Sequence, residues 1–501
     1  LYTGNMTFGN IEFSELDDIK LDGTLFSSAN MSTSCETNTA YMTFGSSTFT
    51  KLTSLELAGA VFATEKMTTE SVNSADSTFA NTIFANMESL NLEGTIFAVS
   101  GMGNKTIESA HNTFASATFV KLESLELTGA VFAVSGMGNG WVHSASWTFQ
   151  HSIFSSLKLL NLDKVIFAVS GIGKGYICTA YNTFSYAYFD ILDSLNLSGA
   201  VFAASDMGGT RIYSADSTFS NVTFNKLAFL DLKDVIFAKS GMSESSYVDT
   251  GFRTFQNAVF SKLAFLGLKG AKFVASGMTN EAVSTAHYTF SGTTFSELPS
   301  LDLSNVVFAV SGMTTGIIET ADSTFEKAIF ENLNSLNLSG AVFAAVGMGG
   351  NGFSIFTGNY TFSHTVFEKL ESLDLFGAVF AAQNMSLENA IIRTANDTFY
   401  SAAFPKLSLL NLRGIFKIEN MGSTNFYSLN YTFEKATFDS EVLKYIYLPK
   451  DETFDKANDW RDTFTTNNTN FAVTVYGYGT RPNWFTWFTG SIFESGLSPE
   501  T

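Results

Sequence analysis

Hydrophobic positions recur along the chain in blocks of about 35 residues. In each block the pair Thr-Phe is followed after five residues by a second Phe, then by Leu-x-x-Leu-x-Leu, and then by a third Phe. The apolar runs are short, rich in β-branched and aromatic residues, and bounded by Gly, and they lack a 3.6-residue period, which predicts strands. The first Phe of the block occurs thirteen times, at positions 8, 44, 79, 114, 149, 184, 219, 255, 290, 325, 362, 399 and 433.

This repetition predicts stacked coils. One block cannot bury three Phe and three Leu side chains by itself, whereas stacked blocks cover one another's open faces. A repeat of this length also suits a helical hairpin, but the short Gly-bounded runs argue against helices. The sequence therefore predicts an all-β fold over residues 1–448: a single right-handed parallel β-solenoid of about 13 coils of about 35 residues, with Phe ladders in its interior.

The residues after this array break the repeat and predict a C-terminal cap. A helix over 451–464 and a strand over 471–478 would form a small α/β cap within residues 449–479. Residues 480–501 form an aromatic tail that either folds over the last coil or reaches a second copy of the chain. No cap precedes the first Thr-Phe pair, which favours head-to-tail self-assembly. The candidate self-assembly residues are Trp484, Phe485, Trp487 and Phe488.

Polar positions of the repeat form columns when the coils are stacked. The Thr before each first Phe predicts a hydrogen-bonded ladder at the coil corner, with an exposed ice-binding array as the alternative. The residue inside Leu-x-Leu, mostly Asn, Asp or Glu, predicts an outward polar ladder, with calcium binding as the alternative. Aromatic residues just before Thr-Phe are candidate ligand contacts, because exposed rings stack on sugars or peptides: Trp147, Tyr181, Tyr288 and Tyr360.

The segment Phe-x-x-Leu-x-Ser-Leu-x-Leu resembles a leucine-rich repeat, and the exit Ile446-Tyr447-Leu448-Pro449 resembles the end of BspA-like arrays. The likeness to BspA-like leucine-rich-repeat surface proteins covers about 440 residues. Two features depart from that family: its unit is shorter, and each coil here carries an extra Gly-Ala-Val-Phe-Ala segment. The resemblance implies an extracellular or cell-surface protein used in adhesion or surface structure, and no enzyme.

Composition narrows the function further. Charged residues make up 15% of the chain and the net charge is −19, so nucleic-acid binding is disfavoured. No apolar stretch is long enough for a transmembrane segment. The five His residues lie in different coils, and no nucleophile–base pair or metal-ligand spacing occurs, so we predict no catalytic site, metal or cofactor. Cys35 and Cys178 lie four coils apart, too far for a disulfide, and each is expected to be a buried or adventitious thiol.

These features predict a structural repeat protein, located outside the cell or on its surface, that forms a filament or layer by binding head-to-tail to itself or to other surface proteins and glycans. The alternative is a monomeric cell-surface adhesin that binds a host protein or glycan through variable columns of the solenoid. Eleven Asn-x-Ser/Thr sequons are present, and the better candidates for N-glycosylation lie in the variable turns, at Asn104 and Asn384.

Overall fold

The structure, a computed structural model, consists of β-strands and turns, with no helix among the residues that it describes. It divides into two compact units: unit 1 is Leu1–Ser261 with Lys269–Thr285, and unit 2 is Lys262–Leu268 with Ala286–Thr501. The described residues are 2–26, 37–62, 71–97, 106–132, 140–167, 175–203, 211–238, 247–274, 282–312, 316–347, 349–351, 354–382, 384, 386–388, 391–413, 425–428, 431–448, 473–477 and 492–495.

In unit 1 successive repeats add strands to three sheets, here called A, B and C. Sheet A contains β1 (Tyr2–Thr3), β4 (Thr37–Thr39), β7 (Ser71–Ser74), β10 (Thr106–Ser109), β13 (Val142–Ser144), β16 (Tyr176–Thr179), β19 (Arg211–Ser214), β22 (Tyr247–Thr250) and β25 (Ala282–Thr285). Sheet B contains β2 (Glu12–Phe13), β5 (Thr48–Phe49), β8 (Ile83–Phe84), β11 (Thr118–Phe119), β14 (Ile153–Phe154), β17 (Tyr188–Phe189), β20 (Thr223–Phe224) and β23 (Val259–Phe260). Sheet C contains β3 (Asp18–Lys20), β6 (Ser54–Glu56), β9 (Ser89–Asn91), β12 (Ser124–Glu126), β15 (Leu159–Asn161), β18 (Ser194–Asn196) and β21 (Phe229–Asp231).

Unit 2 repeats the same arrangement. Its strands before the Thr-Phe corner are β28 (Ile317–Thr320), β32 (Ser354–Thr357), β36 (Ile391–Thr394) and β39 (Asn425–Ser428). Those around the second Phe are β26 (Thr294–Phe295), β29 (Ile329–Phe330), β33 (Val366–Phe367), β37 (Ala403–Phe404) and β40 (Thr437–Phe438). Those of the Leu-x-Leu segment and beyond are β24 (Phe265–Gly267), β27 (Ser300–Asp302), β30 (Ser335–Asn337), β34 (Ser372–Asp374), β38 (Leu409–Asn411), β41 (Tyr445–Tyr447), β42 (Thr474–Gly477) and β43 (Ile492–Ser495), and a separate pair is β31 (Gly349–Asn351) with β35 (Ser386–Glu388).

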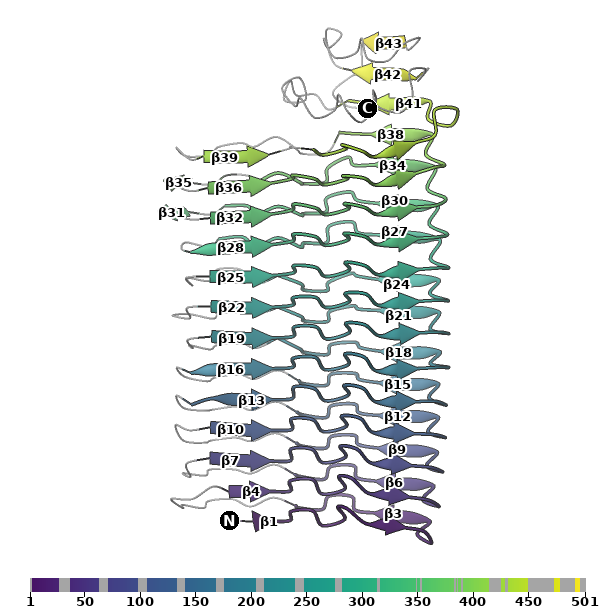
Figure 1. The fold of residues 1–501 in the computed structure, drawn as a ribbon, viewed down its shortest axis with the longest axis vertical. Coiled ribbons are helices and arrows are strands. Elements are labelled where there is room, and N and C mark those ends of the chain that lie inside the picture. Colours follow the sequence, from purple (N-terminus) through teal and green to yellow (C-terminus); the bar gives the residue numbers. More distant parts are fainter. Residues whose placement is uncertain are drawn as a thin grey trace. The chain divides into compact units, whose positions relative to one another are not determined.

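Within each unit, the paired strands of the repeat array up to β41 run parallel and lie one repeat apart. Ile107 pairs with Val72 on one side and with Val142 on the other, so the register advances by one block of the sequence pattern per coil. Figure 1 shows this stacking inside each unit as strands that lie side by side in sequence order. The predicted parallel β-solenoid with a coil of about 35 residues is therefore confirmed.

Three Phe ladders fill the interior of each unit, as predicted. In unit 1 the ring centroids of successive rungs are separated by 4.6 Å for Phe26 and Phe62 and by up to 5.4 Å for Phe189 and Phe224. The ring planes are nearly parallel, with an angle of 10° between Phe97 and Phe132. Phe132 itself has no exposed surface. Because Phe recurs at the same position of each coil, every ring stacks on the Phe rings of the adjacent coils, and water is excluded along each column.

The Thr-Phe corner combines left-handed backbone with a buried Thr. Ala110 and Asn112 have φ angles of 52° and 55°, a conformation that costs about 1–2 kcal/mol for an L-residue. Hydrogen bonds to the next coil offset this cost, as when Asn112 N donates to Ser146 O at 2.9 Å. Thr113 is fully buried, and its hydroxyl donates to Ala110 O at 2.8 Å. The Thr column is thus the predicted corner ladder, and its burial rules it out as an exposed ice-binding array.

The C-terminal predictions have a mixed outcome. The strand predicted over 471–478 is present as β42, which pairs in parallel with β41, and β43 pairs in parallel with β42. Parallel stacking therefore continues beyond residue 448. The helix predicted over 451–464 lies outside the described residues, and so does the aromatic segment with Trp484, Phe485, Trp487 and Phe488. The cap and the domain boundaries stay predictions.

Candidate binding surface

The outer side of sheet A in unit 1 carries a row of aromatic rings, which we call the aromatic face. It consists of Trp141, Tyr176, Tyr213 and Tyr247, one residue from each of four successive coils. Tyr176, Arg211 and Tyr247 share one register column, and Tyr213 stands two residues further along its strand. The centroid of the Tyr213 ring lies 5.7 Å from that of Tyr176 and 5.9 Å from that of Tyr247, so Tyr213 supplies the ring in the coil whose column position is Arg211.

Alternation along the strands places these rings outside. In β19, Ile212 and Ser214 are buried, whereas Arg211 is exposed and Tyr213 is half-buried. Trp141, just before β13, is 61% exposed. A strand that alternates in this way directs every second side chain away from the core. The aromatic face is therefore a property of the outward positions of sheet A and not of the Phe ladders.

The rings of the aromatic face are tilted against one another. Trp141 and Tyr176 lie 5.3 Å apart with an angle of 33° between their planes, and the angle rises to 46° between Tyr176 and Tyr213. In the interior, Phe149 and Phe184 lie 4.7 Å apart at only 5°. Closely stacked rings bury their faces on each other, whereas tilted and more widely spaced rings leave part of each face to solvent. The outer row can thus still accept a planar or apolar surface.

A histidine–tryptophan cluster borders the aromatic face. The His143 ring lies 5.9 Å from Tyr176 and 5.8 Å from His111, and His111 in turn lies 4.6 Å from Trp147. Only 8% of His111 is exposed, and burial lowers its pKa to about 3, so this imidazole is neutral. His111 Nδ1 and Trp147 Nε1 are buried without a hydrogen-bond partner among the described residues. Such groups are uncommon in native proteins.

Buried acids of unit 1 follow the same corner column as His111. Burial raises the pKa of Asp76 to about 8, with the nearby Glu108 adding to the effect, and raises that of Asp216 to about 7. Ser77 Oγ donates to Asp76 and Ser217 Oγ donates to Asp216, which opposes the rise in each case. At neutral pH Asp76 is therefore mostly protonated, whereas Asp216 is about half ionised.

The charges along the aromatic face are few and of both signs. Arg211 and Arg253 are exposed, and Glu108 is half-buried on the neighbouring register column. The Arg253 guanidinium lies 4.5 Å from the centre of the Phe252 ring, a cation–π contact. Cys178 is buried beside Ser146, one of the two outcomes expected for it, and burial raises its pKa to about 12. Cys35 lies outside the described residues.

The four ligand-contact residues predicted from the sequence do not form one cluster. Trp147 and Tyr181 belong to adjacent coils of unit 1, where Trp147 N donates to Tyr181 O at 2.7 Å, and both side chains are half-buried. Tyr288 and Tyr360 belong to unit 2, where Tyr288 is half-buried and Tyr360 is 45% exposed. Trp147 packs on His111 at the border of the aromatic face, so one predicted residue adjoins the surface described here.

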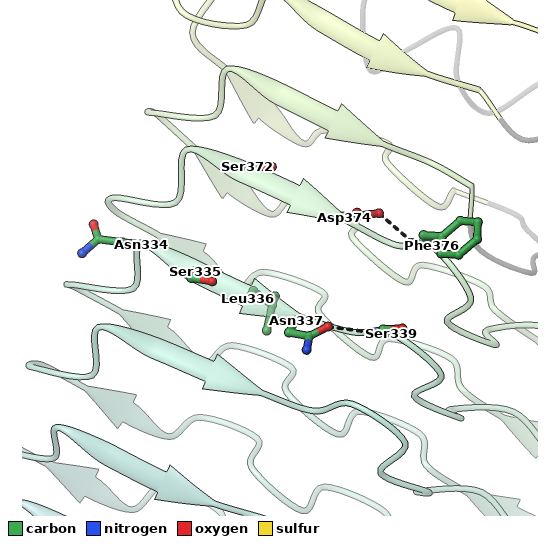
Figure 2. A pocket seen from close by; sticks show the side chains of 8 residues that line it. All are labelled: Asn334, Ser335, Leu336, Asn337, Ser339, Ser372, Asp374 and Phe376. Atoms are coloured by element: carbon green, nitrogen blue, oxygen red, sulfur yellow. Dashed lines mark hydrogen bonds between the residues drawn. The ribbon is translucent and has the colours of Figure 1, made fainter. Parts of the chain in front are cut away.

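A hollow lies on the outer side of β30 and β34 in unit 2 (Figure 2). We call it the polar groove; its volume is about 320 Å³. Two of its polar side chains are already engaged, because Asp374 Oδ1 accepts from Phe376 N at 2.9 Å and Asn337 Oδ1 accepts from Ser339 N at 3.1 Å. Phe376 is 55% exposed at its rim. The lining residues are Asn334, Ser335, Leu336, Asn337, Ser339, Ser372, Asp374 and Phe376.

The polar ladder predicted from Leu-x-Leu is present. Leu125 and Leu127 are buried, and the half-buried Glu126 between them accepts from Asn161 Nδ2 at 3.0 Å. In unit 2, Asn337 Nδ2 donates to Asp302 Oδ1 at 2.9 Å. Amide groups between carboxylates thus replace like-charge repulsion by hydrogen bonds. No group of three or more His, Cys, Asp or Glu positioned to hold a metal ion occurs in the described part of the chain, and calcium binding by this ladder stays untested.

The remaining predictions concern glycosylation and membranes. Asn384 is exposed, with a φ of 52°, and Asn104 lies outside the described residues. Within the described ranges, no helix is long and apolar enough to cross a membrane.

The sequence analysis did not predict the aromatic face, because its residues Trp141, Tyr176, Tyr213 and Tyr247 do not adjoin the Thr-Phe pairs. The signal that could have found them is the alternation six to eight residues earlier. There, the repeats of unit 1 align Trp141 with Tyr176 and Tyr247, whereas the same column holds Ser71, Thr106, Arg211 and Ala282 in other coils.

No protein-family model, no curated protein and no solved structure matches this chain. The likeness to BspA-like proteins therefore stays a resemblance, and the function has to be inferred from the molecule itself.

Proposed function

We propose that this chain is a non-enzymatic repeat protein of an extracellular surface, and that it holds a partner on the aromatic face of unit 1. The observation that carries the proposal is the row Trp141, Tyr176, Tyr213 and Tyr247, in which tilted rings leave apolar surface in contact with water. Aromatic residues dominate binding energy where they are exposed before and covered after association. The rigid Phe ladders underneath hold the rings in place before a partner arrives, which lowers the entropic cost of binding.

Of the two roles expected from the sequence, the aromatic face favours the surface adhesin. The filament or layer subunit depends on residues 480–501, most of which lie outside the described residues, so that role stays a prediction. Location outside the cell is an expectation from the resemblance to surface proteins.

The test uses the full chain with a fluorescent label and intact, washed cells of the organism that makes it. The variant Trp141→Ala/Tyr176→Ala/Tyr213→Ala removes three rings of the aromatic face. The matched control Tyr186→Ala/Tyr188→Ala/Phe229→Ala removes three exposed rings elsewhere on unit 1, which are 52%, 41% and 51% exposed.

We expect the first variant to lose at least about tenfold of the cell-bound signal, because hot-spot rings each contribute about 2 kcal/mol or more. The control should bind like the parent chain. Equal binding by all three proteins, or an equal loss in both variants, would contradict the proposal.

A further inference from the structure

The spacing of the aromatic face is regular, with ring centroids 5.3, 5.7 and 5.9 Å apart from one coil to the next. One ring per coil gives a ladder of platforms along the direction in which the coils stack. The step between platforms is close to the length of one sugar ring in an extended polysaccharide. A linear ligand of repeating units, lying along that direction, would place successive units over successive rings. A globular partner has no such repeat to match.

The chemistry around the rings suits hydroxyl groups. Burial raises the pKa of Tyr176 and that of Tyr213 above 10.0, so both phenols keep their proton and can donate as well as accept. Arg211 lies between the Tyr176 and Tyr247 positions of its column and supplies further donors. Apolar ring faces combined with such polar groups match the apolar face and hydroxyl edge of a sugar.

The charge pattern argues for a neutral ligand. Arg211 is exposed within the row, and Glu108 and the buried Asp249 lie on the register column of Tyr213, so no field of one sign covers the aromatic face. The whole chain carries a net charge of −19, which repels a polyanion such as a nucleic acid or a sulfated glycan.

We infer that the aromatic face is a binding site for a neutral linear polysaccharide, which lies along the stacking direction with about one sugar unit on each of Trp141, Tyr176, Tyr213 and Tyr247. This inference rests on the proposed function and names the chemical class of the partner.

The first experiment measures the affinity of the full chain for neutral oligosaccharides of two to eight sugar units by isothermal titration calorimetry. The probes are β-1,4-glucan, β-1,3-glucan and chitin fragments, and heparin serves as the polyanionic probe. Affinity for at least one neutral series should rise with length up to about four units, one per ring, and then level off. Trp141→Ala and Tyr176→Ala should each weaken binding by about 3- to 10-fold, the loss expected for one aromatic contact.

Matched variants distinguish ring stacking on the ligand from a loss of folding and from nonspecific binding to exposed aromatic residues. Tyr176→Phe keeps the ring and should retain most of the affinity, whereas Tyr186→Ala, which removes a 52% exposed ring elsewhere, should change nothing. Thermal unfolding of each variant checks that the fold is intact. Binding that is absent for every neutral series, independent of length, or equally strong for heparin would overturn the inference.

A second experiment keeps this inference distinguishable from the proposed function. Cells are treated either with a mixture of β-1,4-glucanase, β-1,3-glucanase and chitinase, or with protease, before the labelled chain is added. Loss of binding after the glycosidase mixture supports a polysaccharide ligand. Loss after protease alone, with binding still dependent on the aromatic face, overturns the polysaccharide and leaves the proposed function standing. Binding that does not depend on the aromatic face overturns both.

Discussion

Replacing Phe132 by Ala tests whether the Phe ladders stabilise unit 1. Phe132 has no exposed surface and stacks between Phe97 at 4.8 Å and Phe167 at 5.0 Å. Truncation of a fully buried Phe costs about 3–5 kcal/mol through lost transfer energy and a residual cavity. Each of the two ring contacts accounts for about 0.5–1.5 kcal/mol of that loss. We therefore expect Phe132→Ala to lower the free energy of unfolding by about 3–5 kcal/mol.

The damage should stay local, because each coil of a repeat protein contacts mainly its two neighbours. Hydrogen-exchange mass spectrometry of the full chain should show faster exchange in peptides from 71–97, 106–132 and 140–167, and unchanged exchange in peptides from 2–26. Chemical denaturation followed by circular dichroism measures the total loss.

Phe229→Ala is the matched control, because it makes the same chemical change at a side chain that is 51% exposed. Its free energy of unfolding should stay within about 0.5 kcal/mol of the parent value. Equal losses in Phe132→Ala and Phe229→Ala, or unchanged exchange around residue 132, would refute the assignment of the ladder as the stabilising core.

Three further predictions concern pH, the coil corner and assembly. Burial raises the pKa of Asp76 from 3.8 to about 8, so its contribution to stability is complete below pH 3.8 and is lost as the pH rises through 8. In thermal melts, the stability of Asp76→Asn relative to the parent should therefore rise between about pH 4 and pH 8, by up to about 1.4 kcal/mol per pH unit, and stay level above pH 8. A relative gain toward acid would contradict this. Ala145→Gly should be neutral or should stabilise the protein by up to about 1 kcal/mol, because Ala145 has a φ of 54° and Gly251 occupies the same corner position in another coil. Clear destabilisation would show that the Ala145 methyl group contributes to packing. Deletion of 480–501 should abolish polymers seen by electron microscopy while the β-rich spectrum is kept, and a full chain that stays monomeric at high concentration would end the filament hypothesis.

The ladders could be predicted because they depend on residue identity at a fixed spacing. Phe79, Phe114 and Phe149 return every 35 residues, and parallel in-register pairing follows directly from bringing like residues together. The left-handed corner could not be predicted in the same way. Ala fills most of its first positions, and Ala carries no signal for a positive φ. Only Gly4, Gly251 and Gly358, which replace it in three repeats, point to that conformation.

The aromatic face was harder to find because it lies at variable positions. A single Trp141 or Tyr247 in one repeat reads as an ordinary surface aromatic. Its meaning depends on the neighbour one coil away, which is 35 or 36 residues distant in sequence but adjacent in the sheet. Aligning the repeats would not have found Tyr213, because it belongs to another register column. Only the ring distances to Tyr176 and Tyr247 show that it is part of the row.

One coil spacing thus supports two kinds of aromatic row with different consequences. In the interior, rings such as Phe154 and Phe189 meet at 5.2 Å and 1°, so each face is covered by the next ring and none remains for a ligand. On the outside, the rings of Tyr213 and Tyr247 lie 5.9 Å apart with an angle of 50° between their planes. The stacked Phe rows bury their ring faces and so stabilise the fold, whereas the tilted row of the aromatic face leaves ring surface that a partner can contact. A variant that lost outer rings should therefore lose its partner and keep its fold, whereas a variant that lost an inner rung should lose local stability first.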